Sequence, residues 1–444
     1  MKENTQLSLF FENISGKKVI ADFNGGDVTS DGGALLLRSV EKRTGLIRSH
    51  CKVLSDNRDK RYTDHSLYEM ISQRVYQISC GYEDANDSDI LRHDPAFKSA
   101  CNRLPLSGAA LASQPTISRL ENRVSRTDLY RLGLAQIAAF VNSYRKAPRS
   151  IIIDVDDTAD IVHGGQQLSL FNAHYNEYCY QPMHFYEGRS GKLITAVLRP
   201  GKRPKGREIF SILKRVVLHI RKQWPHVKII LRGDSHFSVP EVHAFCYKHN
   251  LGFVLGQSIN TTIKSMAPAE ILKEIHGIHG KDIRWYTDTF YQAKSWHREN
   301  RLIIKTSVTS KGCDVRAVVT NLPWKSYTRI YEKLYCGRGN MENMIKNHKS
   351  ILRSDRTSCT RFEANQLRLF LHGIAYSLLH RLQKEGLRGT EFETAQFDTI
   401  QRWLLRVGAQ VIERTRKILF HLPSSYTMKE LFAKVHNRFV FGFT

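Results

Sequence analysis

Four side chains in the segment YCGRGNMENMIKNHKS have the types and spacing needed for chemistry at a phosphodiester: Tyr335, Arg338, Glu342 and Lys349. At about 100° per residue, a helix through them would align all four on one face. A carboxylate between two cations stays ionised and can hold a divalent metal, while the cations reach toward phosphate. Taken alone, a charged stripe of this kind is more typical of a solvated helix face with ordinary ion pairs.

Two aspartates earlier in the chain stand at the ends of predicted strands. Asp156 ends the apolar run 150–156, and Asp234 lies just after the strand 227–232. If these strands are parallel neighbours, their carboxyl ends meet at one edge of the sheet, and the helix that carries Glu342 can close the third side. Three crowded carboxylates repel one another unless cations neutralise them. We therefore predict that Asp156, Asp234 and Glu342 hold two Mg²⁺ ions, for which Mn²⁺ can substitute.

The first strand offers an alternative acid, because IIIDVDDTAD places Asp154 and Asp156 on the same face, with Asp157 turned the other way. We favour Asp156 because it directly precedes the turn that ends the strand. Asp154 is retained as a substitute or as a neighbouring metal ligand.

The elements around these acids have a recognisable order. The chain changes from helical to strand-like periodicity near residues 146–150. Three strands, a helix, a strand, a helix and a strand then follow, at 150–156, 178–187, 193–199, 206–224, 227–232, 240–250 and 252–257. This order predicts an α/β protein with a ribonuclease H-like catalytic core.

The remaining segments divide the chain into five predicted regions. A mostly β insertion interrupts the core, and mainly helical regions precede and follow it. The predicted regions are an N-terminal helical DNA-binding region (1–146), the first part of the core (147–258), the β-rich insertion (259–330), the closing helices of the core (331–385) and a C-terminal helical region (386–444).

The composition indicates a polyanionic partner. The chain has 67 Lys and Arg against 42 Asp and Glu, a net charge of +25. Because the excess is spread through folded segments and interleaved with aromatic residues, nucleic acid is the expected partner. No run approaches the roughly 18 apolar residues of a membrane span, so we expect a cytoplasmic protein with no membrane partner. The eight cysteines form no CxxC pair, and neither a disulfide framework nor a zinc ribbon is expected.

Two further segments are candidates for DNA contact. In LASQPTISRLENRV, Ser113 is a potential N-cap and Pro115 lies in the first turn, so this helix is either the second helix of a helix-turn-helix or a plain surface helix. A basic loop after the third strand is either a phosphate-binding or a merely solubilising loop, and its cations are Lys202, Arg203, Lys205 and Arg207.

Several stretches together resemble one family over nearly the whole chain. They are FNGGDVTSDGGALLLR, IIIDVDDTAD with HGGQ, HYNEYCYQPMHFYEG, LRPGKRP, LRGDSHF, and LYCGRGNMEN with DRTSC and FEANQLRL. The chain is similar to DDE transposases of bacterial insertion sequences, and specifically resembles the insertion-sequence 1380 family. The resemblance implies that Asp156, Asp234 and Glu342 are the three acids, and that Tyr335, Arg338 and Lys349 contact the DNA backbone near the transposon end.

The same resemblance implies a reaction and partners. Such transposases bind terminal inverted repeats, nick the DNA to free a 3′-hydroxyl, and join it to target DNA, so a homodimer on double-stranded DNA in the bacterial cytoplasm, at the nucleoid, is expected. Relatives with this signature can pass through a DNA hairpin, with a flipped base stacked on a tryptophan of the insertion. Here Trp324 lies beyond the corresponding strand, and Trp285 and Trp296 lie elsewhere, so the hairpin route stays open.

Two other functions remain as alternatives. One is a nuclease or resolvase of the ribonuclease H fold, which the long insertion and the signature helix disfavour. The other is a catalytically inactive DNA-binding derivative, which the three acids disfavour.

Overall fold

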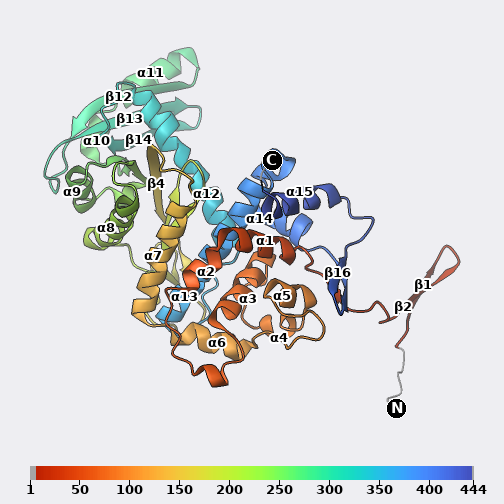
Figure 1. Ribbon diagram of the computed structural model, residues 1–444. Coiled ribbons are helices and arrows are strands. Elements are labelled where there is room, and N and C mark those ends of the chain that lie inside the picture. The colour runs from red at the N-terminus through yellow and green to blue at the C-terminus, as the bar shows by residue number, and fades with distance from the viewer. Residues whose placement is uncertain (1–6, 443–444) are drawn as a thin grey trace. The chain divides into compact units, whose positions relative to one another are not determined.

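The computed structural model describes residues 7–442 and is a mixed α/β protein, as the sequence predicts. Two compact units can be distinguished. The first combines the described residues up to Leu120 with those from Ile374 onward, and the second covers Glu121–Gly373. Figure 1 shows the course of the chain. Within residues 7–442, no helix has both the length and the apolar character needed to cross a membrane.

The first unit joins the two ends of the chain. Its N-terminal part begins with strands β1 (Leu9–Ile14), β2 (Lys17–Ala21) and β3 (Val28–Thr29) and continues with helices α1 (Ala34–Thr44), α2 (Leu46–Cys51), α3 (Leu67–Cys80), α4 (Ser88–Leu91) and α5 (Pro95–Ala100). Its C-terminal part contains α14 (Phe397–Ile400), β15 (Ala409–Arg414), β16 (Lys417–His421) and α15 (Lys429–Val440). β15 pairs with both β16 and β3.

One prediction about these ends needs correction, and one alternative that the sequence leaves open is decided. The C-terminal region is not purely helical, because the alternating sequences AQVIER and KILFH form a hairpin around the tight turn at Thr415 and Arg416. The segment LASQPTISRLENRV does form helix α6 (Gln114–Arg123). However, residues 101–113 separate α6 from α5, which is longer than the short turn of a helix-turn-helix.

The second unit contains an eight-stranded sheet in the order β12-β13-β14-β11-β10-β4-β8-β9. Its central strands run parallel, whereas all other neighbours are antiparallel. The parallel strands are β4 (Ser150–Asp157), β10 (Lys228–Gly233) and β11 (Gly252–Gln257), and β8 (Met183–Glu187) and β9 (Leu193–Val197) complete one side. The strand predicted at 178–187 is in fact two, because Pro182 has no amide hydrogen and interrupts it. The earlier half is β7 (Glu177–Tyr180). It belongs to a small separate sheet, in which it pairs with β5 (Asp160–Ile161) and β6 (Leu170–Asn172).

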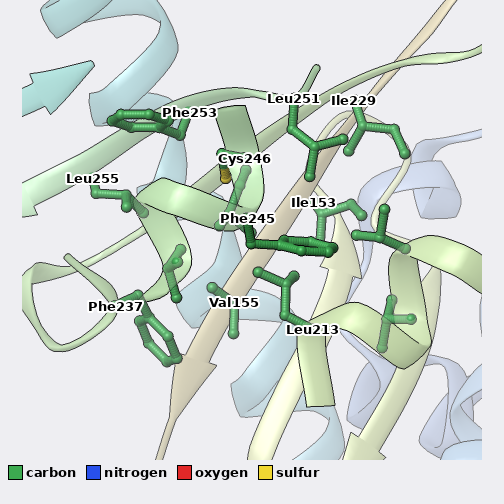
Figure 2. Close-up of a cluster of buried hydrophobic side chains, with 14 of the residues drawn as sticks. Ile153, Val155, Leu213, Ile229, Phe237, Phe245, Cys246, Leu251, Phe253 and Leu255 are labelled. Atoms are coloured by element: carbon green, nitrogen blue, oxygen red, sulfur yellow. The ribbon is translucent and has the colours of Figure 1, made fainter. Parts of the chain in front are cut away.

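The central strand β4 is buried on both faces. Ile153 and Val155 belong to a hydrophobic cluster with residues of α8 (Gly206–Gln223) and α9 (Pro240–Lys248). Figure 2 shows Leu213 and Phe245 of these helices beside them. On the opposite face, Ile152 packs in a second cluster with residues of the segment after the insertion. Because side chains alternate along a strand, Asp154 and Asp156 share the face of Ile152.

The segment predicted as a mostly β insertion begins with two helices, α10 (Thr261–Ser265) and α11 (Ala269–His279). Three antiparallel strands follow, β12 (Ile283–Tyr291), β13 (Asn300–Thr309) and β14 (Gly312–Thr320). β14 pairs with β11, so the insertion continues the central sheet.

The helix predicted through Glu342 is not a uniform α-helix. It consists of a π-helical segment η3 (Arg329–Tyr335), a 3₁₀ turn η4 (Cys336–Arg338), the short α12 (Gly339–Ile345) and a second π-helical segment η5 (Lys346–Ile351). A π turn holds more residues than an α turn, so side chains beyond it are rotated away from their ideal α-helical positions. Two longer helices are α7 (Arg126–Asn142) and α13 (Phe362–Arg381).

Two leucines of α8 provide a direct test of the core. Leu213 is 1% exposed, whereas Leu218 on the same helix is 40% exposed. We expect Leu213→Ala to lower the free energy of unfolding by about 2–5 kcal/mol, because it removes buried methyl groups and leaves a cavity. Leu218→Ala should change it by no more than about 0.5 kcal/mol. Urea unfolding of both variants checks this, and equal effects would contradict the packing described for α8.

Candidate active site

Asp156 and Asp234 leave the sheet at the same edge. In the parallel pair of β4 and β10, Arg232 lies opposite Asp154 and Gly233 lies opposite Val155. The next residues along the two strands are Asp156 and Asp234, and neighbouring strands are only about 4.8 Å apart. The predicted convergence of these two carboxylates is therefore built into the register.

Asp156 is a partly buried acid with one strong cationic partner. Arg338 donates a hydrogen bond from Nη2 to its Oδ2 over 2.6 Å. Burial raises the pKa of Asp156 to about 7; Arg338 opposes this rise, and the neighbouring Asp234 and Asp157 add to it. The edge thus holds more negative charge than Arg338 alone offsets.

Asp154 has a different role. It is fully buried, and the guanidinium of Arg232 donates to both of its carboxylate oxygens, over 2.5 Å and 2.6 Å. Arg232 also donates from Nη1 to the carbonyl oxygen of Leu334, over 2.5 Å. This pairing occupies Asp154 within the protein and favours Asp156 over Asp154 as the first acid, while the metal-binding role of either remains a prediction.

Two glycines leave the space for the Arg232 guanidinium. A Cβ atom on Gly188 would lie 2.5 Å from its Nη2, and one on Gly337 would lie 2.8 Å from its Nη1. Both distances are shorter than real Cβ contacts, so any larger residue would displace Arg232. Gly337 lies directly before Arg338, and this close approach brings Arg338 to the edge of β4.

His236 lies between two of the acids. Its Nδ1 is 3.5 Å from Asp157 Oδ1 and 3.9 Å from Asp234 Oδ2, and its amide N–H donates to Asp234 over 2.9 Å. The interaction with Asp157 raises the pKa of His236, while burial and the positive charge of Arg203 oppose the rise. His236 therefore contacts the acids directly, whereas the neighbouring Phe237 is fully buried.

Lys349 reaches the segment directly after β4. Its Nζ donates to Thr158 Oγ1 over 2.8 Å and to the carbonyl oxygen of Ala159, and lies 3.7 Å from Asp160 Oδ1. Burial raises the pKa of Asp160 to about 8; Lys349 opposes this rise and Asp355 adds to it. Lys349 is thus a cation fixed near the acid edge.

Tyr335 lies at a cavity that adjoins Asp234. Its hydroxyl is so close to Gly256 that a Cβ there would be 2.7 Å away. The cavity has a volume of about 560 Å³, and the two cations that line it are Lys305 and Arg316. The aromatic side chain and the second aspartate therefore share one open space.

Glu342 does not join the two aspartates in this structure. Its side chain is exposed, and no described residue forms a hydrogen bond or an ion pair with it. Within residues 7–442, no group of three or more His, Cys, Asp or Glu side chains is close enough to hold a metal ion. Lys349, in the π-helical segment η5 beyond Glu342, instead contacts the residues directly after β4.

The basic loop and the tryptophans are also placed. Lys202, Arg203, Lys205 and Arg207 are all exposed and form no ion pair with a residue that the structure describes. Of these four cations, Arg203 is the one whose positive charge lowers the pKa of His236 beside the acids.

The three tryptophans of the insertion region differ in exposure. Trp296 is buried, whereas Trp285 on β12 is 53% exposed and Trp324 is 36% exposed.

The residues at the edge fit a divalent cation. Asp156 and Asp234 supply oxygen ligands of the kind that Mg²⁺ prefers. Burial raises the pKa of Asp156, and the negative charges of Asp234 and Asp157 raise it further. Asp157 Oδ2 is buried and has no hydrogen-bond partner among the described residues. A bound cation would supply the missing charge.

Arg232 is the main residue that sequence reasoning missed. Its signal was present, because Asp154 stands two residues before Asp156 and Arg232 stands two residues before Asp234. Once the two acids are taken as neighbours on parallel strands, Asp154 and Arg232 must be opposite each other. Thr158 and Asp160, the partners of Lys349, carried no comparable signal.

The sequence from residue 11 to residue 440 matches the family described as transposase DDE domain group 1. Because the match covers nearly the whole chain, this protein belongs to that family of DDE transposase domains. The family defines a class of proteins that carry out DNA transposition and depend on divalent metal ions.

Two further comparisons complete the picture. None of the curated proteins compared with the chain matches it. Among solved structures, a match is the cryo-EM structure of a piggyBac transposase synaptic complex with hairpin DNA, at 11% identity and a TM-score of 0.43, covering 85% of this chain and 80% of that chain.

The raised pKa of Asp156 predicts a pH dependence of stability. In the metal-free protein, the folded state keeps this carboxyl protonated up to about pH 7, whereas the unfolded state releases the proton near its ordinary value of 3.8. The protonated carboxyl of Asp156 therefore makes its full contribution to the free energy of unfolding below pH 3.8, and this contribution is lost as the pH rises through about 7. Asp156→Asn cannot ionise, so its stability relative to wild type should rise between about pH 4 and about pH 8.

Thermal unfolding across this pH range measures the difference. Mg²⁺ added at the upper end should stabilise wild type more than Asp156→Asn, because only the carboxylate attracts the cation. A constant difference between the two proteins at every pH would contradict the account of Asp156.

Proposed function

We propose that this protein is a transposase of the insertion-sequence 1380 family. It binds the terminal inverted repeats of its insertion sequence, cleaves the ends, and joins the 3′-hydroxyls to target DNA by two-metal phosphoryl transfer. One observation carries the proposal: Asp156 and Asp234 leave neighbouring parallel strands at one edge, beside Arg338 of the segment that also carries Glu342. Membership of the DDE transposase family supports the reading of these acids as catalytic.

The catalytic core is proposed to be ribonuclease H-like. The strand order β9-β8-β4-β10-β11 supports this assignment, with β4, β10 and β11 parallel and β8 and β9 antiparallel. The helices α8 and α9 follow β9 and β10 in the expected order. We retain residues 147–258 and 331–385 as the core, 259–330 as the insertion, and 1–146 as the region that binds the repeats, with 386–444 as a further region.

Asp156, Asp234 and Glu342 are proposed to hold Mg²⁺. When bound, two such ions activate the attacking oxygen and stabilise the leaving oxygen of a phosphodiester. Glu342 is exposed and has no partner among the described residues, which leaves its carboxylate available to join the two aspartates.

The cations of the signature segment are proposed to contact DNA. In the DNA-free protein Arg338 is hydrogen-bonded to Asp156, and a metal at Asp156 would release the guanidinium toward a phosphate. Lys349 and Tyr335 flank the same edge and are assigned to the DNA backbone as well. The exposed loop with Arg203 extends this surface, because the positive charge of Arg203 is close enough to lower the pKa of His236.

Two transposon ends must be brought together, so we propose a homodimer on DNA. A hairpin intermediate is compatible with an exposed tryptophan in the insertion, and Trp285 on β12 is the most exposed of the three there.

Cleavage of a linear DNA that carries matched inverted repeats, in the presence of Mg²⁺ or Mn²⁺, tests the proposal. We expect wild type to cut at the repeat ends. Asp156→Asn, Asp234→Asn and Glu342→Gln should each lower the rate by more than about 100-fold, the upper range for residues that only support a metal ligand. Lys311→Gln, at an exposed turn of the insertion, serves as the control.

Other outcomes distinguish the alternatives. Specific binding of the repeats without any cleavage would indicate an inactive derivative. Cuts that depend on DNA branching and fall outside the repeats would indicate a nuclease or resolvase.

A further inference from the structure

Three polar side chains form a row across the strands of the insertion. Tyr286 on β12 lies opposite Lys305 on β13, and Lys305 lies opposite Arg316 on β14. Residues directly opposite each other on neighbouring strands share one face of the sheet. Ile303, two residues before Lys305, is on the same face and packs in the buried cluster that contains Tyr331 of η3. The row therefore faces η3.

Glu332 on η3 binds two members of this row. Tyr286 donates its hydroxyl hydrogen to Glu332 Oε1, and Lys305 Nζ lies 3.1 Å from the same oxygen. Arg284, also on β12, is 3.9 Å from it. The hydrogen bond from Tyr286 lowers the pKa of Glu332, burial opposes this shift, and Lys305 adds to it. Glu332 is therefore an ionised carboxylate held by two strands of the insertion.

Aromatic contacts continue from this carboxylate to Tyr335. The ring centroids of Tyr286 and Tyr331 are 5.7 Å apart, and those of Tyr331 and Tyr335 are also 5.7 Å apart. Tyr331 is 2% exposed, so packing fixes its ring. The hydroxyl of Tyr335 lies against Gly256, as noted above, at the cavity that adjoins Asp234. Contacts thus run without interruption from β12 to this cavity.

Glu332 also offsets a repulsion within the row. Like charges directly opposite each other on neighbouring strands are destabilising, and Lys305 is opposite Arg316. Arg316 pairs with Asp314 over 2.8 Å, and Lys305 pairs with Glu332. Both cations line the cavity that adjoins Asp234. Loss of the Glu332 charge would leave Lys305 repelled by Arg316 and would weaken its contact with η3.

We propose that Glu332 is a positioning residue, which couples the insertion to η3 and so holds Tyr335 at the cavity beside Asp234. Glu332 and Tyr335 are three residues apart on η3, so a displacement of one moves the other. The proposal rests on the proposed function, because it gives Glu332 a role in cleavage at this site. It assigns that role to an acid outside the three proposed metal ligands.

Two variants each remove one part of the contact. Glu332→Gln removes the negative charge, and Tyr286→Phe removes the hydroxyl group but keeps the aromatic ring. The control is Asp288→Asn, which removes a carboxylate charge from another ion pair of the insertion. In that pair, Arg301 Nη2 lies 2.7 Å from Asp288 Oδ2. Circular dichroism confirms that all three variants are folded.

Single-turnover cleavage of repeat-bearing DNA, measured over a range of protein concentrations, separates DNA affinity from the rate at saturation. We expect both variants to lower the saturated rate at least about tenfold relative to Asp288→Asn, because a misplacement of about 1 Å can cost about 100-fold. The protein concentration at half-maximal rate should change by no more than about twofold, since the phosphate contacts that dominate affinity remain.

Two results of this assay would overturn the proposal. One is a saturated rate equal to that of the control in an active protein. The other is a loss confined to DNA affinity. A simple loss of folded protein cannot imitate the expected result, because it changes the amount of active protein and leaves the saturated rate constant unchanged.

Amide hydrogen exchange of the full-length, metal-free protein separates this proposal from the proposed function. We expect residues 329–338 to lose protection in Glu332→Gln and to keep it in Asp288→Asn. If wild type cuts no ends while this protection is lost, the proposed function fails and the coupling through Glu332 is supported. Unchanged protection of residues 329–338 would overturn the coupling, whether or not the protein cuts DNA.

Discussion

The buried guanidinium of Arg232 is the interaction on which the candidate site depends. It joins Asp154 on β4 to the carbonyl oxygen of Leu334, so one side chain ties two parallel strands to the segment that carries Arg338. A buried charge is tolerated only when it is paired and hydrogen-bonded. Any movement of this segment away from the sheet would leave both Arg232 and Asp154 without part of their compensation. The cost of that loss holds Arg338 close to the acid edge.

Charge balance explains the rest of the arrangement. Burial raises the pKa of Asp156, and Asp234 and Asp157 lie close enough to raise it further. The cationic partners at this edge are Arg338 and His236. This compensation is incomplete, as the unpartnered oxygen of Asp157 indicates. A site of this kind attracts a divalent cation and the phosphates that accompany it.

Much of this organisation follows from sequence patterns, and the exceptions have physical causes. Strands β4, β10 and β11 were predictable from their apolar runs. The proximity of Asp156 and Asp234 was predictable from their positions at the ends of strands. The directions of the Glu342 and Lys349 side chains were not predictable from the sequence. The segment contains π-helical turns, and no periodicity of the sequence indicates them. Pro182 divided one predicted strand between two sheets, and the pairing of β15 with β3 joins residues nearly four hundred positions apart. Such long-range pairing depends on packing that a local pattern does not encode.

Amide hydrogen exchange of Arg232→Lys tests the central claim most directly. Lysine keeps the positive charge but cannot donate to both Asp154 oxygens and to Leu334 at once. The account predicts that residues 334–351 lose protection in this variant, while α8, whose packing on Ile153 and Val155 does not involve Arg232, keeps the protection it has in wild type. Unchanged protection of residues 334–351, in a variant shown to be folded, would contradict the claim that Arg232 holds the signature segment against the sheet.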